Sequence, residues 1–159
     1  MKYAILIKPD EEIEIKEYVD FHTIQELVDG CFEGCGVFGV LNKMVLLFCN
    51  DEFLLRDDTT FNAIGTIFAD QPVYGNVVVL EDGYNDEYER DAIPFSKDDA
   101  ESLHDAMVNF KHFFRDIIDT LHSHYDNNKP EPHFEFKAVT AEELSDRFFD
   151  KSEDCHEEV

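Results

Sequence analysis

The start of the chain has the side-chain pattern of two paired strands. In MKYAILIKP, residues 1–9, both alternating sets of side chains are largely apolar, which predicts a strand buried on both faces, whereas EIEIKEY after Pro9 alternates apolar with charged residues. Successive side chains of a strand point to opposite faces, so a period of two predicts strands. We expect the two segments to pair as a hairpin.

The next segment predicts a short helix. Thr23 and Glu26 have the spacing of a capping box, in which each side chain bonds a backbone amide of the first turn. Positions with helical spacing follow, and two glycines end the pattern: Ile24, Leu27, Val28 and Cys31, then Gly34 and Gly36. We expect this helix to pack on the hairpin.

The middle of the chain predicts further strands. GVFGVLNKMVLLFCN contains two apolar runs about a turn at Asn42-Lys43, and VYGNVVVLED forms another run in which Gly75 suggests a bulge. Between them, residues 57–72 could begin a short helix at Thr60 or run extended, and because Gly65 weakens both patterns we expect a connector.

From Ser96 onward the period becomes helical. Apolar residues recur in steps of four and three: Leu103, Met107, Phe110, Phe114, Ile117 and Leu121. This spacing predicts one long helix over residues 97–125, capped by Ser96 and covering the sheet. Val108, Phe113 and Ile118 widen the stripe, so we expect a second contact, either with the end of the chain or with another subunit in a homo-oligomer.

After the turn-rich DNNKPEP, the pattern predicts one more strand in HFEFKAV and a last short helix capped by Thr140 and Glu143. The predicted fold is α+β: a mainly antiparallel sheet of about five strands covered by a long helix, with a C-terminal strand-helix extension. We expect an α+β domain at residues 1–125 and an appended segment with an acidic tail at residues 126–159.

The charge balance narrows the range of partners. The chain of 159 residues has a formal net charge of −24, from 37 acidic and 13 basic residues. Such a charge repels phosphate backbones and anionic lipids, and it attracts basic proteins. We therefore expect no direct binding to nucleic acid or membrane. With no signal-peptide pattern, the four cysteines favour the cytoplasm.

The order of these segments resembles the family labelled domain of unknown function 3846. The resemblance covers roughly residues 1–107 and rests on MKYAILIKPDEEIEIKEY, IQELVDG, the strand ending in CNDE, Asn62-Ala63, VYGNVVVL and SKDDAESL. Proteins resembling this family are small, occur in bacteria, phages and mobile elements, and have no established activity. The resemblance thus implies where such a protein occurs, and it assigns no catalytic residue to this chain.

No residue pattern supports catalysis or a cofactor. Cys31 and Cys35 would share one face of a helix, but neither CxxC nor HExxH occurs, so we expect thiols that bind no metal. The histidines are scattered around the predicted long helix. The chain has no nucleophile elbow and no phosphate-binding glycine loop. We therefore expect a protein that is not an enzyme.

The most acidic segment is EDGYNDEYERD, residues 81–91, predicted to be a loop. It allows three interpretations: a solvated loop that guards a sheet edge, a calcium site whose glycine comes too early, or a surface for a basic partner. In the third, the tyrosines act as aromatic anchors. The candidate partner-binding residues are Glu81, Asp82, Tyr84, Asp86, Glu87, Tyr88, Glu89 and Asp91.

We expect an acidic protein-binding protein of phage or mobile-element origin. Its carboxylates would imitate the phosphates of DNA and occupy a basic surface of a host protein that handles nucleic acid, as a counter-defence inhibitor does. The alternative is a module that sequesters a small molecule or nucleotide signal between the sheet and the long helix, although few cations are present to bind phosphate.

Overall fold

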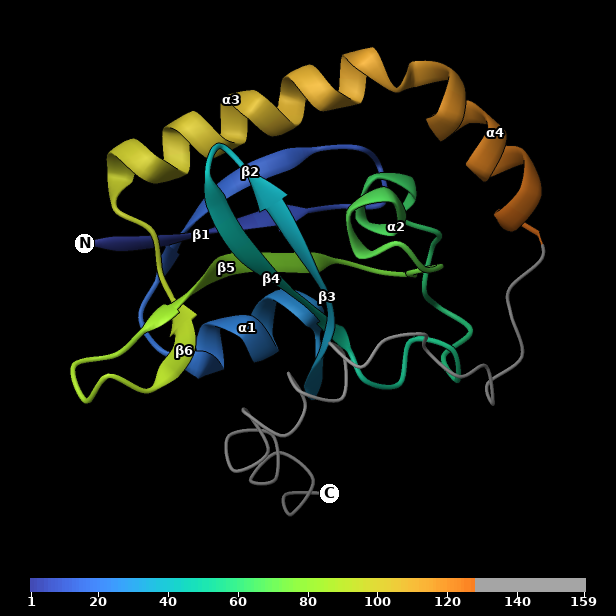
Figure 1. Cartoon of the computed structure of the whole chain (residues 1–159). Coiled ribbons are helices and arrows are strands. Elements are labelled where there is room, and N and C mark those ends of the chain that lie inside the picture. The colour runs from blue at the N-terminus through green and yellow to red at the C-terminus, as the bar shows by residue number, and fades with distance from the viewer. Residues whose placement is uncertain (128–159) are drawn as a thin grey trace.

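The structure, a computed structural model, describes residues 1–127 of the chain (Figure 1). It confirms an α+β fold with an antiparallel sheet, which has six strands. In chain order the elements are β1 (Lys2–Ile7), β2 (Ile13–Tyr18), α1 (Phe21–Val28), β3 (Phe32–Val40), β4 (Lys43–Asn50), α2 (Ala63–Ala69), β5 (Val77–Tyr84), β6 (Arg90–Ile93), α3 (Lys97–Phe113) and α4 (Arg115–Tyr125).

The sheet has β5 near its centre. The strand order is β2-β1-β5-β4-β3, and β6 pairs with the second half of β5. All pairings are antiparallel, and the predicted β1–β2 hairpin is confirmed, with Ile5 opposite Ile15 and Ile7 opposite Ile13. The turn between β3 and β4 lies at Leu41-Asn42, one residue before the predicted position, and both residues have positive φ.

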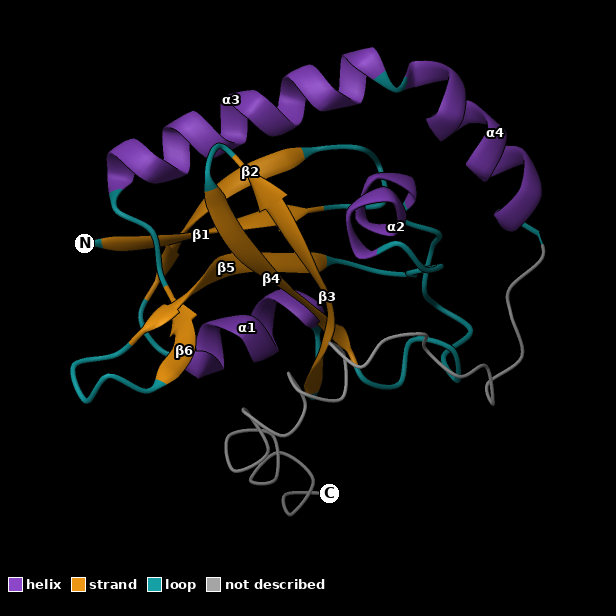
Figure 2. Ribbon diagram, in the orientation of Figure 1, coloured by secondary structure: helices purple, strands orange, loops and turns teal. Residues whose placement is uncertain are grey.

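Helices cover both faces of the sheet (Figure 2). On one face, Ala4, Leu6 and Phe48 pack with residues of α1. On the other, Ile5, Ile7 and their neighbours pack with residues of α2, α3 and α4. The central strands are therefore buried on both sides, as their near-continuous apolar runs require.

The first helix begins and ends earlier than predicted. Its N-cap is Asp20, whose carboxylate accepts a hydrogen bond from His22 N, while the Thr23 hydroxyl instead accepts one from Val19 N. The helix ends at the left-handed residue Asp29, whose carbonyl accepts hydrogen bonds from Asn50 and Arg56. Residues 32–40 are consequently free to form β3, which contains Gly34 and Gly36.

The predicted single helix over residues 97–125 is two helices. Ser96 caps α3 as predicted, with its hydroxyl accepting from Asp99 N at 3.2 Å. The helical path breaks at Phe114, whose ψ of 26° lies outside the helical range. α3 packs on β1 and β2, whereas α4 contacts α2. The predicted C-terminal strand and helix lie outside the described residues.

Candidate protein-interaction site on the β5–β6 hairpin

The acidic segment predicted to be a loop is mostly a β-hairpin. β5 continues to Tyr84 and β6 begins at Arg90, so that Asp82 pairs with Ala92 and Tyr84 with Arg90. Only residues 85–89 connect the strands. The prediction of a loop was wrong because it rested on the acidic composition of the segment. The strands are instead held by backbone hydrogen bonds between β5 and β6, which composition does not report.

Asn85 holds the turn in one conformation. Its backbone N–H donates to Glu89 O at 2.9 Å, and its side-chain oxygen accepts from the amides of Glu87 and Glu89 at 2.9 and 3.1 Å. Tyr88 has a left-handed backbone, with φ of 61°. Because Asn85 and Glu89 are hydrogen-bonded to each other, residues 86–88 form the loop itself. A left-handed residue at the last position is typical of such three-residue hairpin loops, where glycine is preferred.

The acids at the base of the hairpin are paired with cations. Glu81 contacts Lys43 Nζ at 2.8 Å, and the same ammonium group lies 3.4 Å from Asp99 in the first turn of α3. Asp82 contacts Arg90 at 2.5 Å, and only 6% of its side chain is exposed. These two carboxylates therefore stabilise the hairpin and its junction with α3.

The acids at the tip have a different environment. Asp86, Glu87 and Glu89 are exposed, and none forms a salt bridge with a cation of residues 1–127. A hydrogen bond with the Glu87 carboxyl group, together with the repulsion between the two, raises the pKa of Glu89. Asp91 is half-buried and accepts a hydrogen bond from Ala92 N. Seven of the eight predicted residues thus divide into a base, whose acids pair with cations, and a tip, whose acids have no cationic partner among residues 1–127, while Asp91 belongs to neither group.

Both tyrosines of the segment are exposed, with 66% of Tyr84 and 89% of Tyr88 accessible to solvent. A large aromatic side chain in solvent offers apolar area that is rigid, because only two torsions need fixing when it binds. We call Tyr84, Asp86, Glu87, Tyr88 and Glu89 the hairpin tip.

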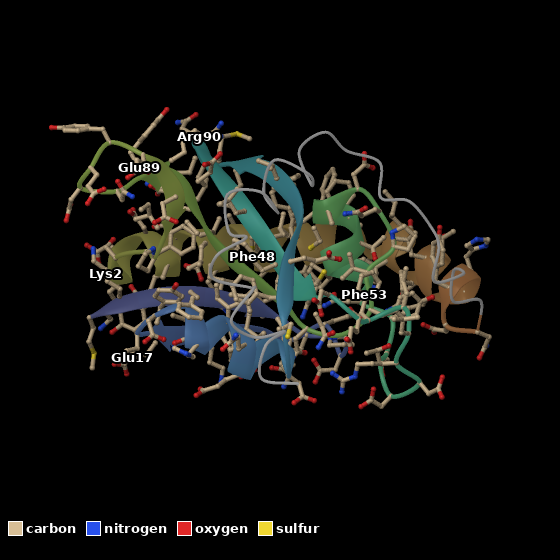
Figure 3. All side chains as sticks on the ribbon, turned by 90° about the horizontal axis from the view of Figure 1, so that it is seen from below. Lys2, Glu17, Phe48, Phe53, Glu89 and Arg90 are labelled. Atoms are coloured by element: carbon tan, nitrogen blue, oxygen red, sulfur yellow. The ribbon has the colours of Figure 1, made fainter. Side chains whose placement is uncertain are left out.

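The hairpin projects from one end of the sheet. Figure 3 shows Glu89 and Arg90 on this projection, at the same end of the molecule as Lys2 and Glu17. The N-terminal turn of α3, with Asp98 and Asp99, lies at this end too (Figure 1). The sequence could not reveal this juxtaposition, because it depends on Lys43 of β4 joining β5 to α3.

The other candidate groups lie apart from one another. Cys31 and Cys35 do not share a helix face: Cys31 precedes β3 and is disulfide-bonded, and Cys35 lies within β3 as a buried thiol. His104 contacts Ile13 O at 2.8 Å, and His122 lies 2.9 Å from Asp126. Within residues 1–127 no three His, Cys, Asp or Glu side chains are arranged to hold a metal ion.

A cavity that sequence reasoning missed lies between α2 and α4. It has a volume of about 370 Å³, and its walls include Ile67, Gln71 and Leu121. None of the lining residues within the described part of the chain is Lys, Arg or His, so these walls offer no cationic group to a phosphate. The expectation of a connector at residues 57–72 was wrong, because this segment contains α2, capped by Asn62, and α2 forms one wall of the cavity.

Comparison with known proteins identifies the family alone. No helix within residues 1–127 is both long and apolar enough to cross a bilayer. No curated protein and no solved structure matches the chain. The model of one family matches residues 1–105, close to the extent of the resemblance in the sequence. The chain belongs to the family described as Domain of unknown function (DUF3846).

Proposed function

We propose that this chain is a non-catalytic acidic interaction protein that binds a basic surface of a protein that handles nucleic acid. The observation that carries the proposal is the hairpin tip, where exposed carboxylates without a cationic partner among the described residues stand beside two exposed tyrosines. Solvated loops do not need large aromatic side chains in water, whereas interface centres are enriched in them.

The tip and the base would have separate tasks. Lys43 and Arg90 hold Glu81 and Asp82, which fixes the hairpin on the sheet. Asp86, Glu87 and Glu89 would pair with Lys and Arg side chains of the partner. The ring faces of Tyr84 and Tyr88 would pack against the same cationic groups. A net charge of −24 would accelerate the encounter, and salt would weaken it.

A basic cleft that binds the phosphates of a duplex would accept such a row of carboxylates. We propose that the chain mimics DNA in this sense and competes with the substrate of the partner. If the chain comes from a phage or mobile element, the proposed partner is a host defence nuclease with a basic DNA-binding surface. Blocking that nuclease would be a counter-defence role.

The test is a charge reversal at the tip. The variant carrying Asp86→Lys, Glu87→Lys and Glu89→Lys should associate with the partner at least about tenfold more slowly, because steering depends on local charge. The partner is first captured from a host lysate at low salt, eluted with rising salt and identified by mass spectrometry. Association rates are then measured by surface plasmon resonance.

A matched control separates the tip from overall charge. Glu12→Lys, Asp57→Lys and Asp116→Lys together change the net charge by the same amount, and all three positions are exposed and outside the hairpin. This control should slow association less than about threefold. Equal slowing by both variants would contradict a role for the hairpin tip, as would an unchanged rate for the tip variant.

A further inference from the structure

The cavity is lined by residues of α2 and α4 and of the segment after α2, and α4 lies at the opposite end of the molecule from the β5–β6 hairpin (Figure 1). Its volume of about 370 Å³ is within the range of small-molecule sites. Ile67, Leu121 and Tyr125 supply apolar surface, and Asp70 and Gln71 supply polar groups. This site is independent of the proposed function.

The walls of the cavity are fixed by contacts outside it. The Tyr74 hydroxyl donates to Tyr125 O at 2.8 Å, and the ring of Tyr125 stacks on Phe61 with 5.1 Å between the ring centres. Asp70 ends α2 in a left-handed conformation, with φ of 56°. The cavity is therefore formed before any ligand arrives, which lowers the cost of binding.

Gln71 carries an acceptor without a donor. Its side-chain Nε2 donates to Cys35 O, but its Oε1 is buried and has no hydrogen-bond partner among residues 1–127. Only 8% of Gln71 is exposed. A buried carbonyl that lacks a donor is destabilising, because it has lost its hydrogen bonds to water without replacing them. Gln71 is one of the residues that line the cavity, so a ligand bound there is placed next to this residue.

The polar groups of the cavity all favour a positively charged donor. Asp70 contributes a carboxylate, and Gln71 contributes the unmatched oxygen. The Thr66 hydroxyl is already used, since it donates to Asn62 O and accepts from Val73 N. Among residues 1–127, no cationic side chain lines the cavity to repel such a ligand or to compete with it.

We propose that this cavity binds a small organic cation, an ammonium or guanidinium group on an aliphatic stem. The cationic group pairs with the Asp70 carboxylate and donates to Gln71 Oε1, and the stem lies along Ile67 and Leu121. Both the charge and the apolar length are needed, because an exposed carboxylate alone gives a pair worth little in water. A free alkylamine and a lysine side chain share this chemistry.

The experiment compares three probes of equal length on the full chain. Titrations with n-pentylamine, 1-pentanol and pentanoate are followed by amide chemical shifts in NMR at physiological salt, which screens non-specific attraction to the acidic surface. Pentylamine should shift the amides of residues 66–71 and 121–125 in a saturable way, and pentanol and pentanoate should not. A fourth titration with Nα-acetyl-lysine amide decides whether the cavity also admits a protein side chain.

Two variants with equal net charge test the site. Asp70→Asn keeps the left-handed backbone, which asparagine tolerates well, and should weaken pentylamine binding at least tenfold. Asp116→Asn removes an exposed carboxylate that is outside the cavity and should change binding less than twofold. Equal binding to the two variants, equal shifts from pentanol and pentylamine, or no saturable shift would each overturn the proposal.

Discussion

At the residue scale, Glu33 shows how burial changes the chemistry of an acidic side chain. It lies in β3 opposite Cys49 and is only partly exposed. Burial, with a smaller contribution from the charge of Asp51, raises the pKa of the Glu33 carboxyl group from 4.5 to about 7. The composition of the chain cannot separate this residue from the exposed acids, because the difference arises only when β3 and β4 pair.

The raised pKa predicts a pH-dependent stability. The folded state holds the Glu33 proton up to about pH 7 and the unfolded state loses it near 4.5, so the free energy of unfolding falls as pH rises through this window. Glu33→Gln should therefore be more stable than the wild type at pH 8, by up to about 3 kcal/mol, and equal to it at pH 4. Urea unfolding at both pH values measures this, and identical differences at pH 4 and pH 8 would refute it.

At the element scale, the β5–β6 hairpin retains an unfavourable residue at its turn. A non-glycine residue in the left-handed region costs roughly 1–2 kcal/mol, and asparagine or aspartate is the usual exception. Tyr88 instead occupies this conformation with 89% of its surface exposed. Strained residues often mark functional sites, and this one is consistent with a tyrosine kept for contact.

Replacing Tyr88 should separate stability from binding. Tyr88→Gly is expected to raise the free energy of unfolding by about 0.5–1 kcal/mol, since glycine adopts positive φ without strain but loses more entropy on folding. Partner affinity should fall, because an aromatic anchor is lost. The control, Tyr84→Gly, lies within β5 and should lower stability. Thermal unfolding of Tyr88→Gly below the wild-type midpoint would count against strain at this turn.

The packing of α2 against β3 depends on a glycine. A Cβ atom on Gly36 would lie 2.9 Å from Cα of Ala69, the last residue of α2, so the helix would have to move. Gly36→Ala should reduce stability by about 1–3 kcal/mol. Gly39→Ala is the control in the same strand, because its nearest new contact is the flexible Met44 sulfur at 3.4 Å. Denaturant unfolding compares them, and similar midpoints would show that α2 adjusts without cost.

At the scale of the whole molecule, the sequence pattern predicted the strands better than the helices. Alternation identified β2, in which Ile13 and Ile15 pack toward the core, and the continuous apolar run of β1 matches a strand that is buried on both faces. The helix break at Phe114 left no signal. Ile117 and Ile118 are both apolar, so the stripe appears continuous, yet Ile118 is buried and 48% of Ile117 is exposed.

The residues of the candidate site could be predicted from the sequence, but their arrangement could not. Acids and tyrosines in residues 81–91 could be read directly from the chain, but their division into base and tip depends on Lys43 and Arg90. Lys43 is distant in sequence and reaches Glu81 only across the β4–β5 pairing. The cavity between α2 and α4 gave no signal, because its walls come from segments far apart in the chain.

The pairing at the base of the hairpin also determines where its charge is felt. Lys43 lies between Glu81 and Asp99, and Arg90 pairs with Asp82, so two cations partly neutralise three acids at the base, whereas Asp86, Glu87 and Glu89 at the tip have no cationic partner among residues 1–127. Because the negative charge is concentrated on a projection, the electric field around the hairpin has a preferred direction as well as a strength. A positively charged surface would be drawn toward this projection once it came within about 10 Å, the distance over which physiological salt leaves exposed charges effective.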